Sequence, residues 1–225
     1  MRYWCIVPAA GSGARMQQST PKAYLPLLDK TVIEYTLQRL LAVSCIEKIM
    51  VVVPDGIPPG FVQPPKIETV IGGQERCHSV LNGLQALVGR ADQQDWVLVH
   101  DVARPCVSLQ DIQTLIGRCE HHPVGGLLAR PIVDTVKRSH ADGSVAETLD
   151  RKQLWCALTP QCFRFGLLLT ALQHAVTQNY LVTDESHAIE LLGHQPLLVE
   201  GLSENIKITY PKDLKRAEFI LREQL

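Results

Sequence analysis

The chain has 225 residues, of which 46% are hydrophobic and 20% are charged, a composition typical of a globular protein with a sizeable core. Its formal net charge of -1 at pH 7 argues against the broad basic face that nucleic-acid binding normally requires. No apolar run approaches the roughly 18 residues of a membrane-spanning helix. We therefore expect one domain over residues 1–225, no nucleic-acid or membrane partner, and any anion site to be local.

The first half of the chain alternates apolar runs with amphipathic stretches. Three runs lack polar alternation, as buried strands do: WCIVPAA, KIMVVVP and WVLVHD, at residues 4–10, 48–54 and 96–101. The first leads directly into a glycine loop, which favours a strand over a signal peptide. Residues 31–43 and 75–88 have helical spacing, and the Pro-rich 54–66 predicts a surface connection. This order predicts an α/β fold, Rossmann-like in three layers around a mostly parallel sheet.

The second half departs from this alternation between residues 125 and 162. A turn at 141–143 between two extended stretches predicts a protruding β-hairpin arm at about 131–155, of a kind that commonly contacts a partner surface. Two helices are expected next, at 165–178 and 183–193, the second capped by Thr183 or Asp184. A short strand over 204–210 and a helix beginning at Pro211 complete the prediction.

The cysteines indicate the redox environment. There are seven, an odd number with no Cys-x-x-Cys pair, which favours free thiols in a reducing cytoplasm over a disulfide framework. Two of the cysteines and two adjacent histidines have side chains that can bind zinc, but their spacings match no standard zinc site. These residues are Cys156, Cys162, His121 and His122.

The stretch PAAGSGARMQQSTPKAYLPL, residues 8–27, predicts a phosphate-binding loop. It lacks the third glycine of a dinucleotide fingerprint and the lysine of a P-loop. Gly11 and Gly13 still allow backbone N–H groups to approach an anion, and Arg15 and Lys22 can converge on one triphosphate. Such a loop suits attack on an α-phosphate with pyrophosphate leaving, because that chemistry needs alignment and charge neutralisation. The alternative is that both cations are solvated surface charges.

Several motifs together identify a resemblance that runs from residue 5 to the last helix. Besides the opening loop they are GGQERCHSV (72–80), HDVARP (100–105), DTVKR (134–138), DR…LW.ALTPQ (150–161), TDE (183–185) and NIKIT (205–209). In this order they resemble the 2-C-methyl-D-erythritol 4-phosphate cytidylyltransferase family. The resemblance implies that CMP passes from CTP to that polyol phosphate, with pyrophosphate released, in the non-mevalonate isoprenoid pathway. It also implies Mg²⁺ and a homodimer whose arms cross.

The resemblance implies a role for each matching residue. Arg15 and Lys22 would stabilise the transition state, and Arg151 and Lys207 would hold the attacking phosphate in line. CTP would contact Ala9, Ala10, Gly11, Gly13, Gly72, Gly73, Ser79 and Asp101. The polyol phosphate would contact Thr135, Arg151, Thr159, Thr183 and Lys207, with Thr135 and Arg151 acting in the neighbouring subunit. Asp101, at the end of an apolar strand, is also the expected Mg²⁺ ligand.

Some of these residues also have a purely structural explanation. Asp101 could cap a turn, Gly72 and Gly73 could simply end a strand, and Thr135 and Arg151 could be ordinary polar residues of a hairpin. Three positions depart from the family pattern, which often has an acidic or amide residue at Gln74, typically aspartate at His78 and usually alanine at Val102.

Three other functions are alternatives to this one. A cytidylyltransferase for another polyol phosphate, such as ribitol 5-phosphate, shares the CTP half of the pattern. A non-catalytic nucleotide-binding module would keep the fold without turnover. An NAD-dependent dehydrogenase would need the third glycine and an acidic residue about 20 positions further on, and Asp29 instead precedes a helix.

Overall fold

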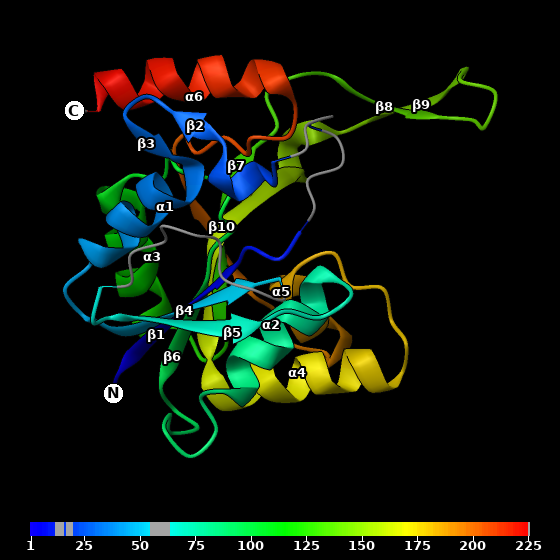
Figure 1. Ribbon diagram of the computed structural model, residues 1–225. Helices are drawn as coiled ribbons and strands as arrows, with labels where there is room; N and C mark the ends of the chain where they lie inside the picture. Colours follow the sequence, from blue (N-terminus) through cyan, green and yellow to red (C-terminus); the bar gives the residue numbers. More distant parts are fainter. Residues whose placement is uncertain (12–15, 17–19, 55–63, 225) are drawn as a thin grey trace.

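The computed structural model describes residues 1–11, 16, 20–54 and 64–224. A sheet of seven strands runs through the molecule in the order β11-β7-β10-β6-β1-β4-β5 (Figure 1). Its strands are β1 (Tyr3–Pro8), β4 (Ile46–Val53), β5 (Ile67–Ile71), β6 (Trp96–Val99), β7 (Gly125–Pro131), β10 (Trp155–Arg164) and β11 (Leu197–Glu200). Strand β10 runs antiparallel to β6 and β7, and the other pairings are parallel. The predicted mostly parallel sheet is therefore confirmed.

Helices cover both faces of the sheet, which gives three layers (Figure 1). Helices α1 (Val32–Leu41) and α3 (Leu109–Glu120) lie on one face, and α2 (Arg76–Gln85), α4 (Phe165–Thr177) and α5 (Glu185–Leu191) lie on the other. Neighbouring residues of strand β1 pack on opposite faces of the sheet. Cys5 packs in the core under α1, whereas Ile6 packs in the core under α2. Because both faces are buried, alternation of polar and apolar residues is absent, as the sequence indicated.

Side-chain caps define where the helices begin. In α1, Thr31 and Glu34 form a reciprocal capping box. Ser108 accepts a hydrogen bond from the Asp111 N–H at the start of α3, and Asp184 accepts one from His187 N–H at 2.9 Å at the start of α5. The predicted cap at Asp184 is confirmed.

A third, smaller core lies above one end of the sheet. There α6 (Pro211–Glu223) packs on the short strand β2 (Pro26–Leu27), which pairs with β3 (Lys30–Thr31). Pro211 is the first residue of α6, as expected. Ile208 is fully buried in this core, which anchors the segment that leads into the helix.

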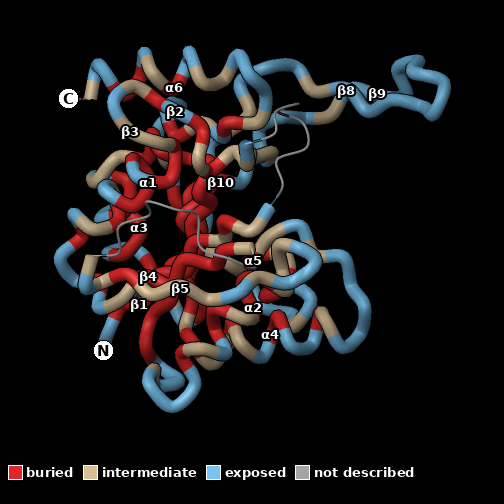
Figure 2. Tube along the Cα trace, viewed as in Figure 1, coloured by how far each residue is buried: buried red, intermediate tan, exposed pale blue. Residues whose placement is uncertain are grey.

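A hairpin arm extends away from these layers (Figure 1). It consists of β8 (Val136–Ser139) and β9 (Val145–Leu149), whose turn contains Gly143 at a φ of 87°. Figure 2 shows that the arm is almost entirely exposed, whereas the central strands are buried. Val133 and Val145 stand 68% and 61% exposed on it. The predicted hairpin arm is confirmed.

Some elements differ from the prediction. The strand expected at 204–210 is wrong: these residues form no strand, because Ile208 N–H bonds to the Ala103 carbonyl without a ladder on either side. Within this segment Ile208 is buried, while Lys207 and Thr209 line a cavity. Helix α3 and strands β5 and β11 were not predicted.

Candidate active site

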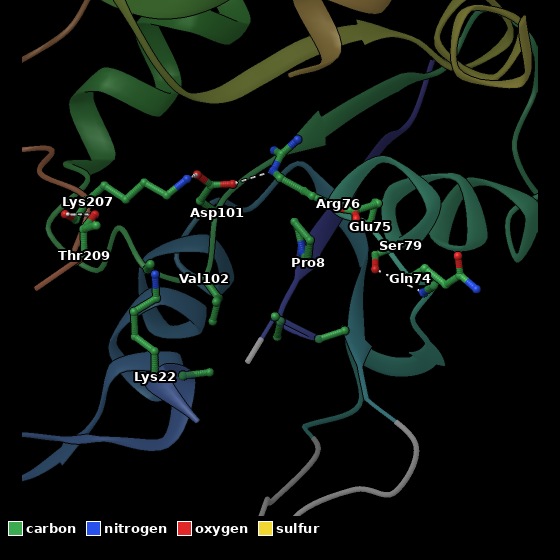
Figure 3. Close-up of a pocket in the computed structure, with 16 residues that line it drawn as sticks. Pro8, Lys22, Gln74, Glu75, Arg76, Ser79, Asp101, Val102, Lys207 and Thr209 are labelled. Carbon is green, nitrogen blue, oxygen red and sulfur yellow. Dashed lines mark hydrogen bonds and ion pairs between the residues drawn. The ribbon is translucent and has the colours of Figure 1, made fainter. Parts of the chain in front are cut away.

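A cavity of about 550 Å³ opens where β1 and β6 end, between the start of α2 and the segment that carries Lys207 (Figure 3). In this view Lys22 and Lys207 lie on one side and Glu75, Arg76 and Ser79 on the other. It stands at the carboxyl ends of parallel strands, where ligands of open α/β sheets bind. Its size is within the range of small-molecule sites.

The opening loop lines this cavity as far as it is described. Ala9, Ala10 and Gly11 contribute to the wall, and Lys22 lies there too. Pro21 is extended, at φ −57° and ψ 140°, immediately before the 3-10 turn Lys22–Tyr24. Lys22 therefore begins a short turn directly after an extended residue. Gly13 and Arg15 lie outside the described residues.

The glycine pair after β5 brings a second loop against the first. A Cβ atom on Gly72 would lie 2.5 Å from the Ala10 Cβ and 3.0 Å from Ser79 Oγ, so only glycine allows this approach. Gly73 N–H donates to Ser79 Oγ at 3.1 Å, and both residues line the cavity. Gly72 thus packs behind the wall, while Gly73 and Ser79 form part of it.

Asp101 lies at the centre of a charged cluster. Its carboxylate accepts from Lys207 Nζ at 2.6 Å and from Arg76 Nε at 3.0 Å. Burial on its own raises the pKa of this carboxyl, but the positive charges of Arg76 and Lys207 outweigh burial and hold the pKa well below its usual range. Asp101 is therefore an anion at neutral pH even though it is only 5% exposed.

A chain of hydrogen bonds holds the backbone of Asp101. Its N–H donates to Thr159 Oγ at 3.0 Å, and the same hydroxyl lies 3.0 Å from His100 Nδ1. His100 Nε2 faces the Arg104 carbonyl, which can only accept, so Nε2 carries the proton and Nδ1 accepts from Thr159. Burial is the main cause that lowers the pKa of His100 to about 4. The ring is therefore neutral, and His100 is a structural residue.

The segment carrying Lys207 is fastened to this same chain. Arg104 donates to the Asn205 carbonyl at 2.7 Å, and Asn205 Nδ2 donates to the Thr159 carbonyl at 2.8 Å. Together with the bond from Ile208 to Ala103, these contacts hold Lys207 beside Asp101. Arg104 therefore braces the segment that carries Lys207.

A smaller cavity of about 120 Å³ lies next to the first. Thr159 and Thr183 line it, and both cavities share Arg76, Asp101 and Lys207. Thr159 stands where the pairing of β10 with β7 is irregular, between Ala157 and Gln161. This irregularity turns the strand's polar groups toward Asp101. Three of the predicted substrate residues, Thr159, Thr183 and Lys207, are thus brought together.

Thr135 and Arg151 are not brought to either cavity. Both are exposed at the base of the arm, where Arg151 donates to the Val133 carbonyl.

Comparison with known proteins identifies the family of this chain. The family model for 2-C-methyl-D-erythritol 4-phosphate cytidylyltransferase matches residues 3–223. The chain belongs to this family. It is 47% identical over 223 residues to the enzyme of that name from Vibrio vulnificus strain CMCP6, covering 97% of this chain and 94% of that protein. The namesake from Tolumonas auensis is 47% identical over 228 residues, with coverage of 99% and 97%. The crystal structure of the Francisella tularensis cytidylyltransferase superposes with a TM-score of 0.85 at 34% identity, with coverage of 98% and 100%.

The positions that depart from the pattern of the cytidylyltransferase family have visible contacts. His78 Nδ1 accepts the Glu75 N–H at 3.3 Å, so the imidazole caps the start of α2. Gln74 and Val102 both line the larger cavity. Val102 is held there because its carbonyl accepts from the Thr36 hydroxyl at 2.7 Å.

Arg76 is the site residue that sequence reasoning missed. It lies within the quoted motif GGQERCHSV, but its partners are far away in the chain, with Asp101 25 and Glu185 109 positions on. The available signal was its place in the first turn of an amphipathic helix, where a cation is unfavourable unless something compensates it.

The side chains at the cavities can be compared with the ligands that a divalent cation requires. Among the described residues, no group of three or more His, Cys, Asp or Glu side chains could hold a metal ion. Mg²⁺ does not need such a group, since it is commonly held by one or two carboxylates together with substrate phosphates and water. Asp101, an anion at the wall of both cavities, fits this role.

No helix in the described parts of the chain is long and apolar enough to cross a membrane.

Proposed function

We propose that the protein transfers CMP from CTP to 2-C-methyl-D-erythritol 4-phosphate, giving 4-diphosphocytidyl-2-C-methyl-D-erythritol and pyrophosphate. The observation that carries this proposal is the wall shared by the two cavities, where Arg76, Asp101 and Lys207 meet. CTP occupies the larger cavity and the polyol phosphate the smaller one. Their reacting phosphates then face each other across this wall.

The nucleotide half rests on the two loops that pack together. Backbone groups of Ala9, Ala10 and Gly11 surround the phosphates, while Gly73 and Ser79 offer backbone and hydroxyl contacts to the cytosine. Gly72 allows the loops to approach. Gly13 completes the phosphate loop in this proposal.

The chemistry is a single in-line displacement. A terminal oxygen of the substrate phosphate attacks the α-phosphorus of CTP, and the bond from that phosphorus to the β-phosphate oxygen breaks as pyrophosphate leaves. Lys22 and Arg15 stabilise the charge that spreads over the transferring phosphorus and the leaving group. No side chain needs to act as nucleophile, because the substrate phosphate is already an anion.

The attacking phosphate is positioned by Lys207 from this chain and by Arg151 from a partner. The ammonium of Lys207 has three donors, so it can contact Asp101 and a phosphate together. Thr159 and Thr183 border the space for the polyol. The Thr159 hydroxyl already accepts from Asp101 N–H, so its contact with the substrate would use its remaining hydrogen-bonding capacity.

Mg²⁺, held by Asp101 and the phosphates of CTP, supplies charge neutralisation at the phosphates. The homodimer is proposed through the arm, with Thr135 and Arg151 reaching the neighbour's site. Both residues are exposed and neither lines a cavity of its own chain, which supports this proposal. The seven free cysteines support the cytoplasm as the location.

The test is pyrophosphate release by the purified protein with CTP and Mg²⁺. Release is expected with 2-C-methyl-D-erythritol 4-phosphate and not with ribitol 5-phosphate, and UTP and ATP should support little turnover. A preference for ribitol 5-phosphate would keep the nucleotide half and overturn the assigned substrate. Silence with every pair would overturn the reaction and favour a nucleotide-binding module.

A further inference from the structure

Arg76 joins three segments that are distant in the sequence. It is the first residue of α2, its Nε donates to Asp101 Oδ1 at 3.0 Å, and its two terminal nitrogens donate to the two Glu185 oxygens at 2.6 and 3.0 Å. Glu185 is the first residue of α5. Arg76 therefore links the starts of two helices to the loop after β6, and it lines both cavities.

This placement contradicts the local preference of the helix. The N-terminus of a helix carries partial positive charge, so a cation in the first turn is unfavourable there. Two carboxylates reverse the balance at Arg76, and their charges raise its pKa further although burial opposes this. Residues that break a local rule and are compensated by distant partners are expected at functional sites.

The contacts fix the orientation of each partner. Glu185 holds the guanidinium plane by a bidentate fork, and its side chain is 1% exposed, so it is shielded from competing water. With that plane fixed, Nε occupies Asp101 Oδ1 and leaves Oδ2 to Lys207. Figure 3 shows Arg76 and Lys207 approaching Asp101 from opposite sides.

We propose that Arg76, held by Glu185, is a positioning residue for the transfer reaction: it orients the Asp101 carboxylate so that Asp101 and Lys207 face the two reacting phosphates. This inference rests on the proposed function. Arg76 acts through Asp101 and needs no contact with the reacting atoms. A lysine keeps the charge but cannot reproduce three donors in one plane, so Arg76→Lys should misplace Asp101.

The competing explanation is that the pair merely clamps α2 to α5. A clamp contributes to stability and leaves turnover unchanged in a folded variant, whereas misplacement of reacting groups by about 1 Å can lower the rate about 100-fold. The chain offers a matched control in Arg90, which makes a similar fork with Glu68 at 2.7 and 3.0 Å and lies away from both cavities.

The experiment compares Arg76→Lys, Glu185→Gln and Arg90→Lys with the wild type. Circular dichroism reports folding, and steady-state kinetics with each substrate varied separates kcat from the two KM values. We expect folded Arg76→Lys to lose about 100-fold in kcat and Glu185→Gln about 10-fold. Arg90→Lys should stay within twofold of the wild type. A folded Arg76→Lys within about threefold of the wild-type kcat would overturn the proposal, and if this variant does not fold, the same threshold applied to Glu185→Gln decides.

A rescue measurement adds a second readout. In Arg76→Ala the missing side chain opens onto the larger cavity, so guanidinium ions at millimolar concentration should restore kcat saturably, and ammonium at equal ionic strength should not. Equal effects of both ions would contradict a role for the planar fork. Wild-type turnover in the same assay separates the two failures: a silent wild type contradicts the proposed reaction, whereas an active wild type with an equally active Arg76→Lys contradicts only the role of Arg76.

Discussion

Lys207 Nζ and Asp101 Oδ2 are 2.6 Å apart in the wall between the two cavities. The carboxylate of this pair is buried, since the Asp101 side chain is only 7% exposed, whereas the Lys207 side chain is 38% exposed at the cavity wall. The pair places a cation at the wall of the smaller cavity, where the polyol phosphate is proposed to bind, and contacts from Asn205 and Ile208 hold its segment in place.

Removal of the Lys207 ammonium should impair binding and turnover of the polyol phosphate more than binding of CTP. Lys207→Met is expected to raise the KM for 2-C-methyl-D-erythritol 4-phosphate and lower kcat/KM for it by about 100-fold or more, because a positioned cation on a transferring phosphate is worth several kcal/mol. CTP affinity, measured by calorimetry, should change less than about fivefold. Lys212→Met, exposed at the start of α6, is the control. A larger loss of CTP affinity than of kcat/KM for the polyol phosphate would contradict the assignment.

Lys22 should matter for turnover more than for binding. Lys22→Ala is expected to reduce kcat by about 100- to 1,000-fold, since its charge is needed most when pyrophosphate departs. Single-turnover kinetics with saturating CTP measures this directly. Lys48, which pairs with Glu68 on the surface, gives the control variant Lys48→Ala. Near-normal turnover in folded Lys22→Ala would remove its role.

Crossed arms predict complementation between inactive chains. If Arg151 acts in the neighbour's site, a heterodimer of Lys22→Ala and Arg151→Ala chains contains one site with both residues intact. A random mixture, half of it heterodimer, should recover about a quarter of the wild-type activity. Differently tagged chains verify that heterodimers form. No recovery in verified heterodimers would show that each site is built from one chain.

Chelation tests the metal assignment. Excess EDTA should abolish product formation and added Mg²⁺ should restore it, because Asp101 is proposed to hold the ion with the phosphates of CTP. Asp101→Asn should raise the Mg²⁺ concentration needed for half-maximal rate. Undiminished turnover in excess chelator would show that the reaction needs no divalent cation.

The buried His100 makes stability depend on pH. Its pKa is lowered to about 4 in the folded protein, against about 6.5 in an unfolded chain, so between these values the unfolded state binds more protons. Stability is therefore lost as the pH falls from 6.5 to 4, by roughly 2 kcal/mol at pH 5 from this residue alone. Urea unfolding of metal-free protein at pH 7.5 and 5 should show this loss, and His100→Gln should lack it. An equal loss in both proteins would contradict the assignment.

Sequence patterns predicted most of what lies near the site. The apolar runs of β1, β4 and β6 and the loops that follow them were readable because they are contiguous in the sequence. Strands β5 and β11 were not predicted, because β5 follows a Pro-rich stretch and both are short. The 204–210 prediction failed because alternation reports which face is buried and not whether a backbone ladder forms.

Arg76 could not be found in the same way. Its role depends on Glu185 and Asp101, and no local pattern shows which distant carboxylates meet a given arginine. The same limit applies to the chain from Asp101 through Thr159 to His100, which needs the irregular pairing of β10.

The most direct test of the proposed reaction follows the oxygens of the attacking phosphate. The protein is incubated with CTP, Mg²⁺ and 2-C-methyl-D-erythritol 4-phosphate labelled with ¹⁸O at its terminal phosphate oxygens, and the products are analysed by ³¹P NMR and mass spectrometry. We predict that all of the label is in the diphosphate of the product, bridging oxygen included, and that pyrophosphate is unlabelled and equimolar. Label in pyrophosphate, or CMP released without the diphosphate product, would contradict direct attack by the substrate phosphate.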